Sequence, residues 1–110
     1  MHPRRGEVWW VAFDPSLGGE IQKTRPAVIV SNNAANTVLN RVLVVPLTSQ
    51  SAKVYPGEAM VTLNGEPRKA MADQLTTASK KRIRSKLGEL SIPDVAAVER
   101  AILLQLGIRR

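Results

Sequence analysis

Apolar residues in the first half of the chain come in short runs that are typical of β-strands. Residues 6–13 (GEVWWVAF) are rich in β-branched and aromatic side chains, and both of their alternating faces are apolar. This pattern predicts a strand that is buried on two sides. Two further runs, residues 26–31 and 41–48, predict a second and a third strand. Pro46 lies near the end of the third, which indicates a sheet edge or a β-bulge there.

The second half of the chain continues this pattern and then changes to a helical one. Residues 59–63 and 69–75 predict two strands joined across residues 64–67 (NGEP), and residues 86–90 predict a short sixth strand. The connecting segments carry turn residues or lack periodicity, and they predict loops at residues 14–24 and 49–58, a polar connection with one helical turn at 32–40, and a short helix at 76–84.

The chain is predicted to end in a helix. Apolar side chains at Val95, Val98, Ile102 and Leu106 share one face of a helix from residue 93 to 106, and Gly107 supplies a stop signal. Many short strands followed by one helix predict a mainly β fold, either a small, strongly bent antiparallel barrel or a sandwich. A length of 110 residues suits a single domain, residues 1–110, with one modest core. Strands that are apolar on both faces in so small a domain favour a homodimer.

Composition adds a preference for acidic partners. The chain has 16 Lys and Arg against 9 Asp and Glu, a formal net charge of +7, which favours nucleic acid or an acidic protein segment over other ligands. A merely basic, soluble protein is the alternative. Cys is absent, which excludes disulfides and cysteine-ligated zinc, and no apolar run approaches the ~20 residues of a membrane span. We therefore expect a cytoplasmic protein with no membrane association.

Several classes of catalytic chemistry have no support in this sequence. The single histidine, His2, lies next to the N-terminus, so a mechanism with two histidines is excluded. The carboxylates show no spacing typical of a metal site, and no Gly-rich loop ends in Lys followed by Ser or Thr. We expect neither a metal ion nor a cofactor.

The remaining candidates for chemistry are Arg25, at the start of the second strand region, and Thr48, at the end of the third. If these strands are antiparallel neighbours, both side chains meet at one rim of the sheet, where a guanidinium fork beside a hydroxyl suits a phosphate. RNA carries its own nucleophile, the 2′-hydroxyl, so alignment and charge stabilisation suffice for cleavage. The alternatives are a solvated arginine and a hydroxyl that satisfies a local turn.

Motifs spread over nearly the whole chain resemble those of the MazF/PemK family of toxin endoribonucleases from bacterial toxin–antitoxin systems. The matching segments are residues 5–9 (RGEVW), 13–15 (FDP), 18–20 (GGE), 25–28 (RPAV), 45–49 (VPLTS), 55–56 (YP) and 72–74 (ADQ), with the closing amphipathic helix. The resemblance implies a barrel of the Src-homology-3-like kind, a homodimer, and metal-independent cleavage of single-stranded RNA, such as mRNA, at a short sequence, leaving 2′,3′-cyclic phosphate and 5′-hydroxyl ends. It also implies neutralisation by a cognate acidic antitoxin.

The resemblance also assigns roles to residues. It places the family's catalytic arginine on Arg25 and its threonine on Thr48, as in the MazF-like branch. The Gly18-Gly19-Glu20 segment corresponds to a loop that covers the active site, which makes Glu20 a candidate for RNA contact or proton handling.

Other site residues follow less directly. Ser49 and Gln50 extend the threonine segment toward the RNA. In the PemK-like branch an arginine lies two residues before the aspartate matched here by Asp73, but this chain has Met71 there. Asp73 is therefore either catalytic or structural.

Base and backbone recognition is expected from exposed aromatic and basic residues. Tyr55 is the best candidate for base contact, while Trp9 and Trp10 are expected in the core and at the dimer seam. Further candidates for RNA binding are Lys23, Lys53, Lys81 and Arg82, the last two in the basic run 80–86 (KKRIRSK), which suits RNA or an acidic antitoxin tail. The alternative function is a non-catalytic toxin or basic binding module of the same fold that acts on a protein target such as gyrase.

Overall fold

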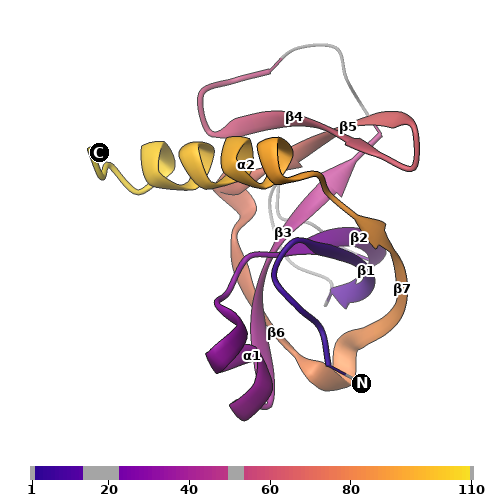
Figure 1. The fold of residues 1–110 in the computed structure, drawn as a ribbon. Helices are drawn as coiled ribbons and strands as arrows, with labels where there is room; N and C mark the ends of the chain where they lie inside the picture. The colour runs from indigo at the N-terminus through magenta and orange to yellow at the C-terminus, as the bar shows by residue number, and fades with distance from the viewer. Residues whose placement is uncertain (1, 14–22, 50–53, 110) are drawn as a thin grey trace.

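A computed structural model describes residues 2–13, 23–49 and 54–109. Within these ranges a bent, seven-stranded antiparallel sheet is flanked by helices (Figure 1). The strands are β1 (Glu7–Phe13), β2 (Lys23–Ile29), β3 (Arg41–Thr48), β4 (Glu58–Leu63), β5 (Glu66–Met71), β6 (Thr76–Ser79) and β7 (Ile83–Glu89). The helical segments are α1 (Asn33–Val38), the short 3-10 turns η1 (Ala72–Gln74) and η2 (Lys80–Arg82), and α2 (Ile92–Gln105). The mainly β fold with a C-terminal helix is thus confirmed.

Strand β3 is the centre of the sheet, whose strand order is β4-β5-β3-β2-β1-β7 with β6 also paired to β3. One side of β3 pairs with β2. The other side pairs with β6 along Arg41–Val44 and with β5 at Leu47 and Thr48. Pro46 lies where β3 changes its partner from β6 to β5. The N–H that proline lacks therefore costs no hydrogen bond in the pairing with either of these strands. Pro46 was predicted to mark a sheet edge or a β-bulge; the edge is wrong because β3 is paired on both sides, and the pairing with β2 runs to Pro46 without a register shift.

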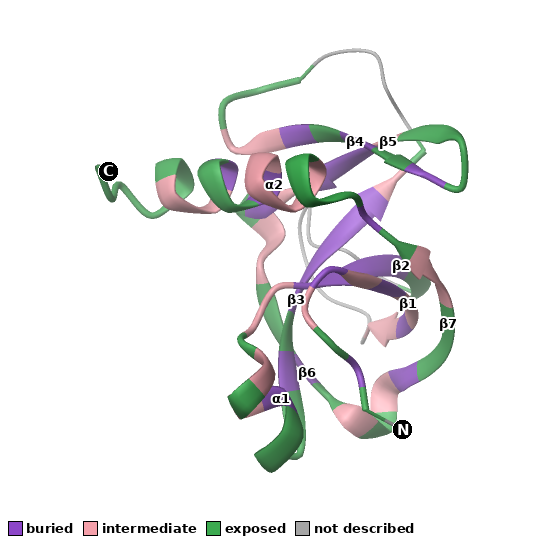
Figure 2. Ribbon diagram, viewed as in Figure 1, coloured by how far each residue is buried: buried purple, intermediate pink, exposed green. Residues whose placement is uncertain are grey.

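Two apolar clusters form the core, one on each side of the β1–β2 pair. The first lies between the sheet and α2 and includes Val8, Leu47 and Val98; the second includes Val11 and Ile29. Figure 1 shows α2 crossing over β4 and β5, and Figure 2 shows buried residues concentrated along the central strands. The prediction that residues 6–13 form a strand buried on two sides is confirmed, since Val8 and Val11 belong to different clusters.

Several element boundaries differ from the sequence-based predictions. Residues 76–79 form a strand, β6, instead of part of a helix, because they pair with β3 along Arg41–Val44. The helical component of that region shrinks to η2. Strand β5 ends at Met71 and the chain continues as η1, so residues 72–75 are not strand. The β4–β5 turn needs only Asn64 and Gly65, which both have positive φ (51° and 83°), the geometry of a two-residue hairpin.

Strand β2 begins three residues before the predicted start at Pro26. Lys23 and Thr24 pair with Phe13 and Ala12 of β1, which extends the strand into the segment predicted as loop. The prediction for α2 was correct, with a start at Ile92, and Gly107 follows it with a φ of 75°. In the described ranges no helix has the length and apolar character needed to cross a membrane.

Candidate phosphate and RNA site

Arg25 and Thr48 lie at the same end of neighbouring antiparallel strands. Strands β2 and β3 pair with Ala27 opposite Pro46, and the same register continued by two residues sets Arg25 opposite Thr48. On its other side Arg25 pairs with Val11 of β1. Arg25 is exposed and Thr48 half-buried. The structure therefore places a guanidinium and a hydroxyl at one rim of the sheet, an arrangement that suits an RNA phosphate.

A buried lysine that the sequence analysis did not single out lies next to Thr48. Lys69 of β5 is the direct antiparallel partner of Thr48 and is only 8% exposed. Partners in an antiparallel pair project from the same face of the sheet. The Nζ atom of Lys69 lies 3.4 Å from Oε1 of Glu58. The sequence places Lys69 at the start of a predicted strand, but only the pairing of β3 with β5 brings it beside Thr48.

Tyr55 lies in a tight turn that Glu58 closes. The backbone N–H of Tyr55 donates to Oε1 of Glu58 at 2.9 Å, and the N–H of Glu58 donates to the carbonyl of Tyr55 at 2.9 Å. Tyr55 is 55% exposed, which leaves much of its ring available to a base. The prediction that Tyr55 is exposed in a loop is confirmed, and its role in RNA contact stays a prediction.

Asp73 lies close to the turn that carries Tyr55. It is exposed in η1, and a Cβ added at Gly57 would lie 3.8 Å from its Cβ and would clash with Oε1 of Gln105. Asp73 thus lies beside Gly57 and the end of α2. Met71, two residues earlier, pairs with Glu58.

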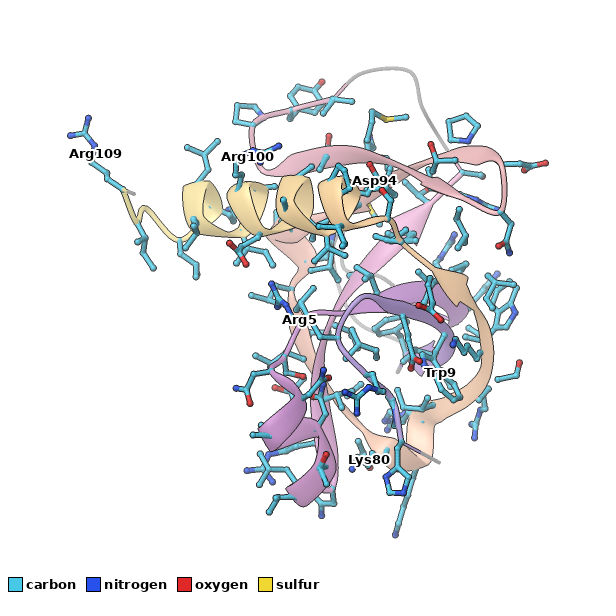
Figure 3. All side chains as sticks on the ribbon, viewed as in Figure 1. Arg5, Trp9, Lys80, Asp94, Arg100 and Arg109 are labelled. Carbon is cyan, nitrogen blue, oxygen red and sulfur yellow. The ribbon has the colours of Figure 1, made fainter. Side chains whose placement is uncertain are left out.

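The basic run of residues 80–86 divides into structural and available charges. Lys80 donates to the backbone carbonyl of Asn36 and is half-buried, next to α1 (Figure 3). Lys86 forms ion pairs with Glu7 at 3.1 Å and Glu89 at 2.9 Å. Lys81 is exposed. The run is therefore only partly available for steering an anionic partner.

Arg82 adjoins the sheet end that carries Arg25. A guanidinium nitrogen of Arg82 donates to the carbonyl of Ala12 at 3.4 Å, and Ala12 pairs with Thr24, the neighbour of Arg25. Lys23, exposed at the start of β2, pairs with Phe13 in the same region. The structure thus brings three of the predicted basic residues, Lys23, Arg25 and Arg82, to one end of the β1–β2 pair.

The carboxylate of Glu7 is held in its charged form. Burial alone raises the pKa of Glu7, but hydrogen bonds from the Arg4 N–H, the Trp9 indole and the Lys86 ammonium together lower it below the ordinary value of 4.5. The Trp9 Nε1 to Glu7 Oε1 distance is 3.0 Å, and Figure 3 shows Trp9 beside β7. This network joins β1 to β7.

The remaining predicted site residues are Ser49 and a group outside the described residues. Ser49 is exposed and directly follows Thr48. Gly18, Gly19, Glu20, Gln50 and Lys53 lie outside the described residues. Across residues 2–13, 23–49 and 54–109, no group of three or more His, Cys, Asp or Glu side chains is arranged to hold a metal ion.

Comparisons with known proteins agree on one family. A family model described as PemK-like, MazF-like toxin of type II toxin–antitoxin system matches residues 4–106. The chain is 36% identical over 114 residues to the endoribonuclease MazF9 of Mycobacterium tuberculosis, which covers 96% of this chain and 97% of the relative. The fold matches the crystal structure of MazF from Deinococcus radiodurans with a TM-score of 0.86 and 29% identity, covering 98% of this chain and 99% of that one.

A second solved structure contains a partner. It is an endoribonuclease in complex with its cognate antitoxin from a Mycobacterial species, matched with a TM-score of 0.79 and 28% identity over 98% of each chain.

Proposed function

Because this chain belongs to the PemK-like, MazF-like toxins of type II toxin–antitoxin systems, we propose that it is an endoribonuclease that cleaves single-stranded RNA at a short sequence without a metal ion. MazF9 of Mycobacterium tuberculosis carries the name endoribonuclease, and its likeness extends over 96% of this chain. The observation that carries the proposal is the arrangement of Arg25 and Thr48 at one rim of the sheet.

In the proposed reaction the 2′-oxygen of one nucleotide attacks the adjacent phosphorus. The 2′-hydroxyl gives up its proton as a bond from the 2′-oxygen to phosphorus forms, the bond from phosphorus to the 5′-oxygen breaks, and the departing 5′-oxygen takes up a proton, so one proton is lost and one is gained. The products are a 2′,3′-cyclic phosphate and a 5′-hydroxyl. Arg25 stabilises the negative charge that grows on the non-bridging oxygens, because a guanidinium stays charged at ordinary pH and binds two oxygens at once. Thr48 donates a hydrogen bond to the phosphate or orients the attacking hydroxyl.

We propose that an acidic antitoxin segment neutralises the toxin by covering this RNA-binding rim. A formal net charge of +7 and the three basic residues at the end of the β1–β2 pair support an acidic partner. The antitoxin complex of the Mycobacterial endoribonuclease supports a protein partner for this fold.

A homodimer is also part of the proposal. A second copy of the chain can cover apolar side chains that are not fully buried in one copy. These are the half-buried Trp9 and Trp10 and the exposed Leu104 and Leu106.

The decisive experiment incubates the purified protein with a long single-stranded RNA in excess EDTA and maps the cut sites and end groups. Discrete cuts at one short motif that leave cyclic phosphate and 5′-hydroxyl ends, and that disappear in Arg25→Ala, are expected. Intact RNA across many sequences contradicts the proposal and favours a non-catalytic binding module of the same fold.

A further inference from the structure

An ion pair joins the strand end that carries Thr48 to the turn that carries Tyr55. Lys69 pairs with Thr48 across β5 and β3, and its ammonium lies 3.4 Å from the Glu58 carboxylate, which in turn accepts the N–H of Tyr55. We propose that Lys69 is a positioning residue that fixes the Tyr55 turn relative to Thr48 and thereby sets the base selectivity of the site. This inference rests on the proposed RNA cleavage.

The register of the sheet determines which way Lys69 projects. Lys69 stands between Thr48 of β3 and Met60 of β4, while the next residue, Ala70, stands between Leu47 and Ala59 in the core. Because side chains alternate along a strand, Lys69 and Thr48 share the face of the sheet opposite to the one on which Ala70 and Leu47 join the core. Directly opposed Cβ atoms in such a pair are about 4.5–5.5 Å apart. The lysine stem therefore starts next to the proposed catalytic hydroxyl.

The ammonium is held away from water. The side chains of Lys69 and Glu58 are only 10% and 13% exposed. A pair this enclosed adds little net stability compared with apolar side chains of similar volume, but removing one partner leaves the other charge without compensation. Orientation of the neighbouring chain is therefore a better account of this pair than stability.

Glu58 transmits that orientation to Tyr55. Its Oε1 atom forms the ion pair with the Lys69 ammonium and also accepts a hydrogen bond from the Tyr55 N–H. The N–H of Glu58 donates to the Tyr55 carbonyl at 2.9 Å. The ion pair and the turn thus form one unit, with Tyr55 presented outward at 55% exposure. Without the ammonium the carboxylate loses the partner that ties it to β5, and the Tyr55 turn loses that tie to the strand pair that carries Thr48.

The chain offers a reporter on this turn that does not depend on activity, because Tyr55 is its only tyrosine. Incorporation of 3-fluorotyrosine gives one ¹⁹F resonance. Lys69→Met removes the ammonium and retains an unbranched stem. We expect a shifted or broadened ¹⁹F resonance in this variant. We also expect a roughly ten-fold fall in the ratio of cleavage at the preferred RNA motif to cleavage at single-base variants, the order of effect expected from a misplaced recognition group.

Two control variants separate the effect of the Lys69 charge from that of net charge. Lys69→Arg keeps the charge and should restore both readouts. Arg68→Met removes one positive charge from the neighbouring position on the opposite face of β5, and should leave both readouts at wild-type values. If Lys69→Met does not fold, Glu58→Gln gives a second test, because the neutral amide oxygen still accepts the Tyr55 N–H but lacks the charge that forms the ion pair with Lys69.

The outcomes are separable. An unchanged ¹⁹F resonance and an unchanged selectivity ratio in the folded variant overturn the inference. Equal changes in Arg68→Met also overturn it, because the effect is then one of net charge. If the wild-type protein cuts no RNA, the proposed function fails, while the ¹⁹F resonance still shows whether Lys69 holds the turn.

Discussion

Replacement of Arg25 by alanine separates catalysis from folding. Arg25 is exposed at the start of β2, and its backbone pairing with Val11 does not involve the side chain. Truncation of an exposed side chain usually changes the free energy of unfolding by no more than about 0.5 kcal/mol. The loss of one group that stabilises charge in a transition state lowers kcat by about 100-fold to 1,000-fold. Because Arg25 is open to solvent in the free protein, we expect the lower end of this range, about 100-fold.

The assay measures single-turnover cleavage of a short RNA that contains the mapped motif, together with thermal unfolding of both proteins. Arg25→Lys is the matched control, since it keeps the charge but loses the fork that binds two phosphate oxygens. Its rate should fall between those of the wild type and the alanine variant. Wild-type turnover in Arg25→Ala refutes the assigned role. A lower rate accompanied by loss of the folded state shows instead that the residue is structural.

Charge reversal at Lys81 and Arg82 should weaken RNA or antitoxin binding and flatten its salt dependence, and unchanged affinity across a salt titration contradicts this role. Because the pKa of folded Glu7 lies below 4.5, its charged form stabilises the fold above about pH 4.5, and this stabilisation is lost as the pH falls through the folded-state pKa. The melting temperature of Glu7→Gln should therefore fall less than that of the wild type between about pH 5 and pH 3; parallel curves contradict the assigned network. Leu47→Ala, at a buried core position, should lower the free energy of unfolding by about 2–5 kcal/mol in a denaturant titration, whereas Val38→Ala, 80% exposed, should have little effect.

Strands with strong local patterns were predictable from the sequence. Residues 41–48 carry enough β-branched side chains to locate β3 correctly, and the spacing from Val95 to Leu106 located α2. Strand β6 was missed because its four residues (TTAS) contain one buried side chain, Ala78, and three exposed polar ones. Such a segment becomes a strand through pairing with β3, which no local pattern reveals.

The candidate site was predictable only in part, for the same reason. The positions of Arg25 and Thr48 at strand ends follow from the chain itself, but their common rim depends on β2 and β3 being neighbours. Lys69 was not identified, because a lysine in a short strand gives no sign of burial until the neighbouring elements are known. Its position beside Thr48 is a property of the tertiary pairing of β3 with β5.

The central place of β3 limits how the proposed toxin can be switched off. Thr48 ends the strand that is hydrogen-bonded to β2, β5 and β6, and it pairs directly with Lys69 of β5, so displacing it disturbs the central strand of the sheet. Segments held in this way open only in events close to global unfolding, whereas singly tethered turns open at far lower cost. An antitoxin therefore has little prospect of acting by distorting the threonine. We therefore expect inhibition by occlusion of the rim, with escape mutations in the toxin accumulating on its surface and sparing the interior.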